Sequence, residues 1–247
     1  MDFVDILSPS SALFLDFDGT LVDLASQPDA VIVPSGLVGT LLALNDYLDG
    51  ALALISGRPI AQIDRFLHPL HLPVAGVHGS ERRSGDGDIT WLETLPMQSV
   101  QDAAAALTAR HPQLRVEHKR GSVALHYRQA PELEALCLQT MEAAVAQSSG
   151  LTLLRGKLVV EAKPGGANKG NAIEAFLQEP PFAGRTPVFV GDDCTDEAGF
   201  DTVQRLQGTG VKVGEGASVA WQRIESPAAL RDQLQRAAAG KGGKVNA

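Results

Sequence analysis

The sequence contains only two cysteines, Cys137 and Cys194, in 247 residues. They lie far apart and lack the close spacing of a zinc site, so we expect reduced thiols rather than a metal module or a disulfide framework. No apolar run is long enough to cross a bilayer. The first residues are acidic and lack the basic region of a secretory signal, so we expect a cytoplasmic protein with no membrane partner.

Basic runs are also scarce, apart from the terminal GKGGK. The net charge is −8 and the isoelectric point is near 5.2. This balance argues against nucleic acid or an anionic membrane as a partner. An anionic small substrate would therefore need a bound metal or a few well-placed cations.

Short apolar runs alternate with segments of helical spacing, which predicts an α/β fold with a parallel sheet. The predicted strands are 11–17, 51–56, 73–77 and 186–190, and the predicted helices are 36–48, 59–67 and 198–206. In such a fold, ligands bind at the carboxyl ends of the strands. We expect the chain from Ala237 onward to be mobile.

The pattern changes in the middle of the chain, where a separate smaller α/β module is indicated. Its predicted elements are a helix at 98–110, a strand at 122–128, a helix at 131–147 and a strand at 156–163. The chain is long enough to carry such an insertion within one larger domain.

Two carboxylates, Asp16 and Asp18, follow the first predicted strand in the stretch FLDFDGTL. Residues i and i+2 of an extended segment point to the same side, so both acids would face one space. Two neighbouring carboxylates repel, which raises one pKa unless a cation lies beside them. The stretch therefore indicates a metal, a shared proton or both; the alternative is that Asp16 only caps a turn.

A second acidic cluster, GDDCTDE at 191–197, directly follows another predicted strand. Asp196 and Glu197 suit the start of the next helix, where acidic residues favour the helix dipole. Asp192 instead lies at a strand end that a parallel sheet could bring beside Asp16. Carboxylate oxygens from two loops are ligands that Mg²⁺ prefers, so the two clusters together predict a magnesium site.

Two loops could bind phosphate. Ser56-Gly57-Arg58 follows a strand and opens a helix, so its hydroxyl and backbone N–H groups could hold phosphate oxygens. Lys169, in the sequence NKG, adds a positive charge at a second loop. Each loop alone is more often a simple turn.

In the order DxDGT, SGR, KG and GDDxTDE, these segments resemble the four motifs of the haloacid dehalogenase-like (HAD) phosphohydrolases. The resemblance implies a Rossmann-like parallel-sheet catalytic core formed by residues 1–88 and 164–247, with an inserted α/β cap domain at 89–163 that sets substrate specificity. It also implies covalent catalysis, in which Asp16 attacks phosphorus. Asp18 would protonate the leaving oxygen and later activate water.

The same resemblance implies the binding residues of this core. They are the Mg²⁺ ligands Asp16, Asp18 (through its carbonyl oxygen) and Asp192; Asp193 and Asp196, which would bind the metal or support its ligands; and the phosphate-binding Ser56, Gly57 and Lys169.

Four longer segments narrow the resemblance to the trehalose-6-phosphate phosphatase family. They are GVHGSERR at 76–83, VEHKRGSVALHYR at 116–128, GKLVVEAKPGGANKG at 156–170 and GDDCTDEAGF at 191–200. The resemblance implies hydrolysis of trehalose 6-phosphate to trehalose and phosphate, the last step of trehalose biosynthesis. We expect the protein to be a monomer.

Cap residues carry the implied specificity. By position, Lys157 and Glu161 would bind glucose hydroxyls, together with Arg120, His126 and Arg128. Alternation in the strand at 122–128 places Val123, Leu125 and Tyr127 on one apolar face, opposite His126 and Arg128. An ordinary half-solvated sheet would show the same pattern. His78 and Glu81 lie in a GxHGxE loop to which the resemblance assigns no role.

Other functions stay open at this point. The protein could be a HAD phosphatase for sucrose phosphate or mannosyl-3-phosphoglycerate, a sugar-phosphate mutase, or a non-catalytic sensor of phosphosugars. The complete set of acids argues against the sensor, and a mutase would depend on a bisphosphate activator.

Overall fold

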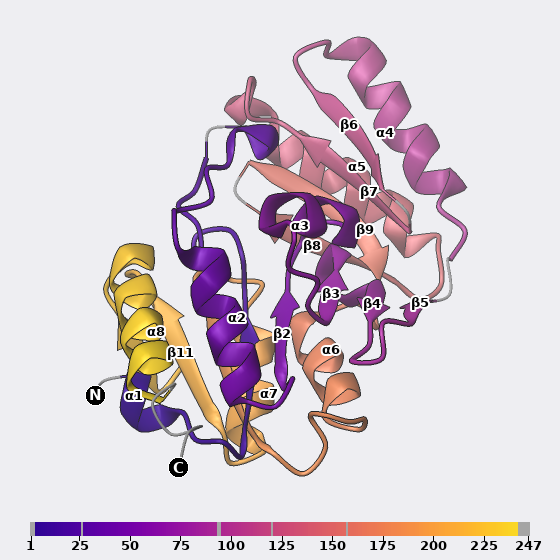
Figure 1. Ribbon diagram of the computed structural model, residues 1–247. Coiled ribbons are helices and arrows are strands. Elements are labelled where there is room, and N and C mark those ends of the chain that lie inside the picture. Colours follow the sequence, from indigo (N-terminus) through magenta and orange to yellow (C-terminus); the bar gives the residue numbers. More distant parts are fainter. Residues whose placement is uncertain (1–2, 26, 93–94, 120, 157, 242–247) are drawn as a thin grey trace. The chain divides into compact units, whose positions relative to one another are not determined.

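The computed structural model describes residues 3–25, 27–92, 95–119, 121–156 and 158–241 (Figure 1). The chain divides into two compact units. The larger unit consists of Met1–Thr90 and Asn168–Ala247, and the smaller unit is Trp91–Ala167.

Helices and strands alternate through most of the larger unit. Its elements are α1 (Phe3–Ile6), β1 (Ser11–Leu15), η1 (Pro28–Ala30), α2 (Leu37–Tyr47), β2 (Leu52–Ile55), α3 (Ile60–Leu67), β3 (Val74–Gly76), η2 (Val77–Gly79), β4 (Glu81–Arg83), β5 (Ile89–Trp91), α6 (Lys169–Phe176), β10 (Thr186–Gly191), α7 (Glu197–Arg205), β11 (Thr209–Val213), β12 (Gln222–Ile224) and α8 (Pro227–Lys241).

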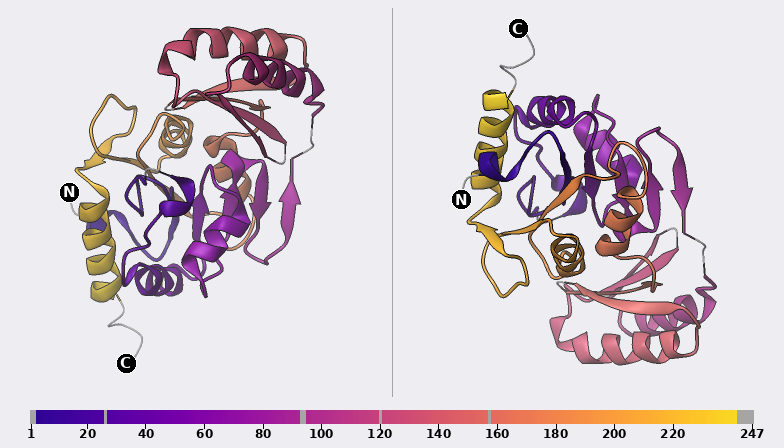
Figure 2. Two further views of the ribbon diagram at one scale, coloured as in Figure 1. Left: turned by 90° about the horizontal axis from the view of Figure 1, so that it is seen from above. Right: turned by 90° about the horizontal axis from the view of Figure 1, so that it is seen from below.

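One sheet of eight strands organises this unit, in the order β12-β11-β10-β1-β2-β3-β4-β5. The strands from β12 to β3 are parallel, and β4 joins β3 antiparallel. Helices α2 and α8 pack together on one face, and α6 and α7 pack together on the other (Figure 2). The predicted α/β parallel-sheet core is therefore confirmed.

The central strands are apolar because helices cover both of their faces. Every residue of β1 and β2 is buried, and Phe14 of β1 stacks on Phe182 at 5.5 Å between ring centroids. β1 pairs with β10 on one side and with β2 on the other, so that Leu15 lies opposite Val190 and Leu54. The residues that follow these three neighbouring strands therefore meet at one edge of the sheet.

The smaller unit is an antiparallel sheet with two helices on one face (Figure 2). Its elements are α4 (Gln98–Arg110), β6 (Arg115–Lys119), β7 (Ser122–His126), η3 (Pro131–Leu133), α5 (Glu134–Ala146), β8 (Leu151–Gly156) and β9 (Val159–Pro164), and the strand order is β6-β7-β9-β8. Val123, Leu125 and Tyr127 lie in its hydrophobic core, which confirms their predicted apolar face.

Three local predictions were wrong. The strand predicted at 156–163 is divided, because Gly156 ends β8 and β9 begins only at Val159. The strand predicted at 122–128 ends at His126. The segment from Ala237 onward, predicted to be mobile, begins inside α8, where Ala237 is buried against the core; its last residues, 242–247, lie outside the described residues.

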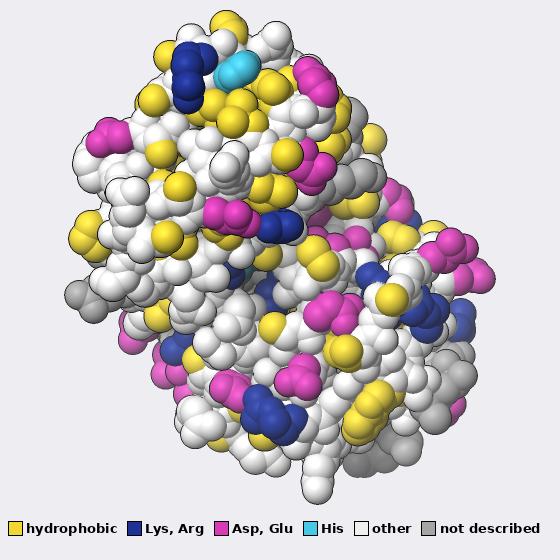
Figure 3. Space-filling model, turned by 180° about the vertical axis from the view of Figure 1, so that it is seen from behind, with side chains coloured by type: hydrophobic (Ala, Val, Ile, Leu, Met, Phe, Trp, Pro, Cys, Tyr) yellow, Lys and Arg dark blue, Asp and Glu magenta, His cyan; other side chains and the backbone are white. Residues whose placement is uncertain are grey.

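The surface carries mixed charge. On the face drawn in Figure 3, Lys and Arg side chains are interspersed with Asp and Glu among the described residues, without a large patch of one sign. None of the helices in the described ranges is both long enough and apolar enough to cross a membrane.

Candidate active site

Three predicted site residues lie at neighbouring strand ends of the larger unit. Asp16 follows β1, Ser56 follows β2 and Asp192 follows β10. The N–H of Asp16 donates to the carbonyl oxygen of Val190 at 2.9 Å, and the N–H of Ser56 donates to that of Ala75 at 2.8 Å. Pairing in the sheet therefore continues up to the positions of the functional side chains and fixes their backbone.

Lys169 lies at the centre of the acidic residues. It is the first residue of α6, which Asn168 caps by accepting the N–H of Asn171 at 2.8 Å. The buried Nζ atom of Lys169 lies 2.9 Å from Oδ1 of Asp16 and 2.7 Å from Oδ1 of Asp196. Burial lowers the pKa of this lysine, but the charges of Asp16 and Asp196 outweigh burial and raise it above its usual value. Lys169 is therefore a permanent cation here.

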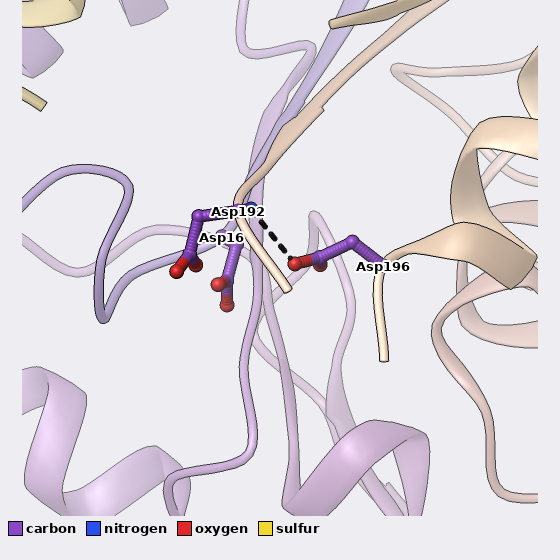
Figure 4. A group of neighbouring side chains, drawn as sticks. All are labelled: Asp16, Asp192 and Asp196. Carbon is purple, nitrogen blue, oxygen red and sulfur yellow. Dashed lines mark hydrogen bonds between the residues drawn. The ribbon is translucent and has the colours of Figure 1, made fainter. Parts of the chain in front are cut away.

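Asp196 fixes the acidic loop from its far side. Its Oδ2 atom accepts the N–H groups of Asp192 at 2.9 Å and Asp193 at 3.0 Å, while Oδ1 binds Lys169 (Figure 4). Both of its oxygens are engaged and the side chain is fully buried. This geometry suits a residue that holds the loop and the lysine in place better than a metal ligand.

A cation could bind between the two strand ends. Carboxylate oxygens of Asp16, Asp192 and Asp196 lie within 4.8 Å of one another, and the Asp16 and Asp192 carboxylates point to the same side (Figure 4). Burial, opposed only in part by Lys169, raises the pKa of Asp16 well above its usual value. Burial and the charges of Asp196 and Asp193 raise the pKa of Asp192 to about 6. The cluster has more negative charge than one lysine balances, and its hard oxygen donors fit a divalent cation such as Mg²⁺.

The position of Asp192 depends on residues of the first loop and on a lysine of β11. Thr20 Oγ1 donates to Oδ1 of Asp192 at 3.2 Å, and Lys212 Nζ donates to the Asp192 carbonyl oxygen. Gly19 has φ +75°, and a Cβ atom there would lie 2.1 Å from Oδ2 of Asp192. Only glycine therefore permits this approach between the two loops.

Asp18 has a different partner from Asp16. Arg58 binds it with two hydrogen bonds, from Nε to Oδ2 at 2.6 Å and from Nη2 to Oδ1 at 2.7 Å. The guanidinium also lies over the ring of Phe66, 5.1 Å from its centroid, and donates to Gln62 at 3.1 Å. The two acids of FLDFDGTL thus lie in different environments, one facing a lysine and one facing an arginine.

The remaining predicted residues of this unit lie in tight turns. Ser56 is buried, and its Oγ accepts the N–H of Arg58 at 3.1 Å. Asp193 Oδ1 accepts both the N–H and the hydroxyl of Thr195, at 2.8 and 2.6 Å. Asp193 therefore stabilises its own turn.

In the smaller unit, the polar face of the sheet carries paired charges. Glu161 is buried; its Oε1 accepts the Ser122 hydroxyl at 2.5 Å and its Oε2 lies 3.2 Å from Lys119 Nζ. His126 Nε2 lies 2.9 Å from Glu117 Oε2. The predicted Arg128 lies beyond the end of β7 and is exposed, and the predicted Arg120 and Lys157 lie outside the described residues.

Several residues of these networks were not predicted from the sequence. Arg58 stands in the SGR motif, but nothing local indicates that it binds Asp18. Lys119 and Glu117 lie in the segment VEHKRGSVALHYR, which carries part of the family resemblance. Alternation along β6 could have placed both side chains on the polar face of the sheet. Lys212 lies in the otherwise apolar β11, beside β10, and no local pattern indicates that its side chain reaches the Asp192 carbonyl oxygen.

Curated proteins with similar sequences carry phosphatase names. The chain is 46% identical over 222 residues to the trehalose-6-phosphate phosphatase of Escherichia coli, covering 88% of this chain and 83% of that protein. It is 44% identical over 237 residues to a probable trehalose-phosphate phosphatase of Sinorhizobium fredii, covering 93% and 89%.

Solved structures share the fold. The C-terminal domain of a Candida albicans trehalose-6-phosphate phosphatase matches with a TM-score of 0.82 at 22% identity, over 94% of this chain and 93% of that one. A Bacteroides thetaiotaomicron phosphatase of the HAD superfamily matches with a TM-score of 0.64 at 15% identity, over 91% and 94%. The sequence profile of the family described as trehalose-phosphatase matches residues 14–231. This match spans the strand ends, the lysine and the acidic loop together, and the chain belongs to the trehalose-phosphatase family.

Proposed function

We propose that this protein hydrolyses trehalose 6-phosphate to trehalose and phosphate through a covalent aspartyl phosphate on Asp16. The observation that carries the proposal is the buried contact of Asp16 with Lys169, beside Asp192, in a chain 46% identical to the E. coli trehalose-6-phosphate phosphatase. A carboxylate held beside a cation at a strand end can act as a nucleophile, and the cation can balance the charge of a phosphoryl group.

The proposal includes a bound Mg²⁺. Asp16, Asp192 and the Asp18 carbonyl oxygen would hold it, with Asp196 supporting them through Lys169 and the loop N–H groups. When bound, the ion neutralises phosphoryl oxygens and keeps the nucleophile ionised. Ser56 and Gly57 would orient the phosphoryl group with their hydroxyl and N–H donors, and Lys169 would balance its charge.

In the first step, an Asp16 oxygen attacks phosphorus and the bond from phosphorus to the sugar oxygen breaks. Asp18 donates a proton to that leaving oxygen, which leaves as the trehalose hydroxyl. Both Asp18 oxygens bind Arg58 in this structure, so one of these bonds must open or shift before the proton is transferred.

In the second step, Asp18 accepts a proton from a water molecule that attacks phosphorus. The bond from phosphorus to Asp16 then breaks, inorganic phosphate leaves, and both acids return to their starting states. The two acids to which the proposal gives different roles also have different partners in the structure, Lys169 for Asp16 and Arg58 for Asp18.

We also propose that residues 1–88 and 164–247 form the catalytic core, and that residues 89–163 form a cap that binds the sugar and sets substrate specificity. The polar sheet face, with Glu161 between Lys119 and Ser122, offers both donors and acceptors for sugar hydroxyls. The proposal also assigns sugar binding to Lys157, Arg120, His126 and Arg128. The cytoplasmic location and the monomeric state stay predictions.

A panel of phosphate esters tests the proposal. We expect Mg²⁺-dependent phosphate release to be fastest from trehalose 6-phosphate, compared with sucrose 6-phosphate, mannosyl-3-phosphoglycerate and glucose 6-phosphate. Phosphate release is measured colorimetrically, with EDTA as the metal-free control. Similar rates on all esters would contradict the assignment to trehalose 6-phosphate, and stimulation by a sugar bisphosphate would favour a mutase.

The substitution Glu161→Ala tests the role of the smaller unit. We expect kcat/KM for trehalose 6-phosphate to fall about 100-fold, because two charge-assisted hydrogen bonds to sugar hydroxyls would be lost. The loss on p-nitrophenyl phosphate, which lacks the sugar, should be less than about threefold on the same reasoning.

Glu142→Ala is the matched control for this experiment, because Glu142 is an exposed acid of the same unit that pairs with Arg155 on the helical side. Glu142→Ala should leave kcat/KM unchanged for both substrates. Equal losses on both substrates in Glu161→Ala would show that Glu161 supports folding rather than the sugar.

A further inference from the structure

The segment GVHGSE at 76–81 lies beside the Ser56–Arg58 loop, because β3 and β2 are paired neighbours. The N–H of Val77 donates to the carbonyl oxygen of Arg58 at 3.1 Å, and the N–H of His78 donates to that of Ser56 at 2.9 Å. The two ends of the Ser56-Gly57-Arg58 turn are therefore held by consecutive residues of one neighbouring loop.

The backbone that makes these contacts is strained. Val77 has φ +48° and His78 has φ +55°, a region that residues other than glycine rarely adopt and that is especially unfavourable for a β-branched residue. Such a conformation persists only where the surrounding contacts determine it, and it is concentrated at functional sites. The strained backbone of Val77 and His78 therefore indicates that the position of this loop serves the neighbouring site as well as local packing.

Glu81 fixes the other end of the same turn. Its Oε1 atom accepts the N–H of Ile60 at 2.5 Å, and Ile60 is the first residue of α3. The preceding residue, Pro59, has no side-chain oxygen to cap the helix, so the carboxylate of Glu81 takes the place of a local capping group. The start of α3, directly after Arg58, thus depends on an acid that is 21 residues away.

His78 covers the middle of the turn. A Cβ atom at Gly57 would lie 2.8 Å from both Cε1 and Nε2 of the His78 ring, so the ring lies directly against the glycine backbone. The 76–81 loop therefore contacts all three residues of the Ser56–Arg58 turn. Through Glu81 it also holds Ile60, just after the turn.

We propose that Glu81 is a positioning residue for phosphoryl binding, which it supports by holding the Ser56–Arg58 turn through the N–H of Ile60. The inference rests on the proposed function, because it takes that turn as the phosphate-binding loop. Glu81 touches no reacting atom: it sets the direction of the Ser56 hydroxyl and of Arg58, whose guanidinium holds Asp18.

Three variants separate positioning from general packing. Glu81→Ala removes the acceptor, Glu81→Gln keeps an oxygen at the same distance, and Ser80→Ala is the matched control in the same loop, because the buried Ser80 hydroxyl has no hydrogen-bond partner among the described residues. We expect Glu81→Ala to lose about 10- to 100-fold in kcat/KM, the range that corresponds to leaving the N–H of Ile60 without its acceptor. Glu81→Gln and Ser80→Ala should stay within about threefold of the wild type on the same scale.

The affinity for inorganic phosphate, measured by calorimetry in Mg²⁺ buffer, tests the same role without turnover of any phosphate ester. Glu81→Ala should bind phosphate at least about tenfold more weakly than the wild type, and Glu81→Gln should restore the affinity. If Glu81→Ala does not fold, Glu81→Asp, one methylene shorter, takes its place in the comparison.

Wild-type affinity in Glu81→Ala, or equal losses in Glu81→Ala and Glu81→Gln, would overturn the positioning role. If the wild type hydrolyses no ester of the panel, the proposed function fails, while the comparison of phosphate affinities still decides the role of Glu81.

Discussion

Asp16→Asn should abolish turnover of trehalose 6-phosphate, with a loss on the order of 10⁴-fold or more, as expected when a covalent nucleophile is removed. The amide is neutral and far less nucleophilic, and nothing else among the described residues lies at the end of β1 beside Lys169 to replace it. Asparagine has nearly the same shape as aspartate, so the fold should be retained. Phosphate release and circular dichroism measure the two effects.

Asp18→Asn is the matched control, because it changes the other acid of the same loop. p-Nitrophenolate leaves without a proton, so Asp18→Asn should still release about one equivalent of it in a burst and then stall, because the second step needs a base. Asp16→Asn should give no burst. A burst in Asp16→Asn, or its absence in both variants, would contradict the proposed roles of the two acids.

The core of the fold could be predicted because its strands are short apolar runs buried on both faces. β1, β2, β3 and β10 lie where the pattern indicated them. β11 was missed because Lys212 interrupts its apolar run; this buried lysine donates to the carbonyl oxygen of Asp192. Strands β4, β5 and β12 were missed for a different reason: each has three residues and, unlike the equally short but fully buried β3, none of them is buried throughout.

The site was only partly predictable. The adjacency of Asp16 and Asp192 follows from the parallel sheet, because β1 and β10 are neighbours in it and neighbouring parallel strands place their carboxyl ends together. The acidic residue Asp196 could be expected near the helix start, but its contact with Lys169 needs the tertiary packing of α6 on α7. The pair of Asp18 and Arg58 likewise links two loops that share no local pattern.

Lys169→Met should inactivate the enzyme and also destabilise it, in a way that depends on pH. Loss of Lys169, which pairs with both the buried Asp16 and Asp196 carboxylates, should cost about 3–5 kcal/mol of unfolding free energy at neutral pH. Activity should fall by about 10²–10³-fold, because the charge that balances the phosphoryl group is lost. Urea unfolding in EDTA and phosphate release in Mg²⁺ measure the two effects.

The sign of the pH dependence follows from the carboxylates. The folded-state pKa of Asp192 is about 6, above its ordinary value of 3.8, and those of Asp16 and Asp196 are also raised, with burial as the largest cause. The folded protein therefore holds more protons than the unfolded chain, so these groups lower the free energy of unfolding as pH rises from about 4 through 6. Lys169→Met removes the main opposing charge, so the decline of the unfolding free energy between pH 5 and pH 7 should be steeper in the variant than in the wild type.

Lys212→Met is the control for this experiment. Its Nζ binds a carbonyl oxygen rather than a carboxylate, so the variant should lose stability with a smaller change in the slope of the pH profile. Parallel pH profiles for the wild type and Lys169→Met would contradict the prediction, because they would mean that the lysine does not compensate the charge of the buried acids.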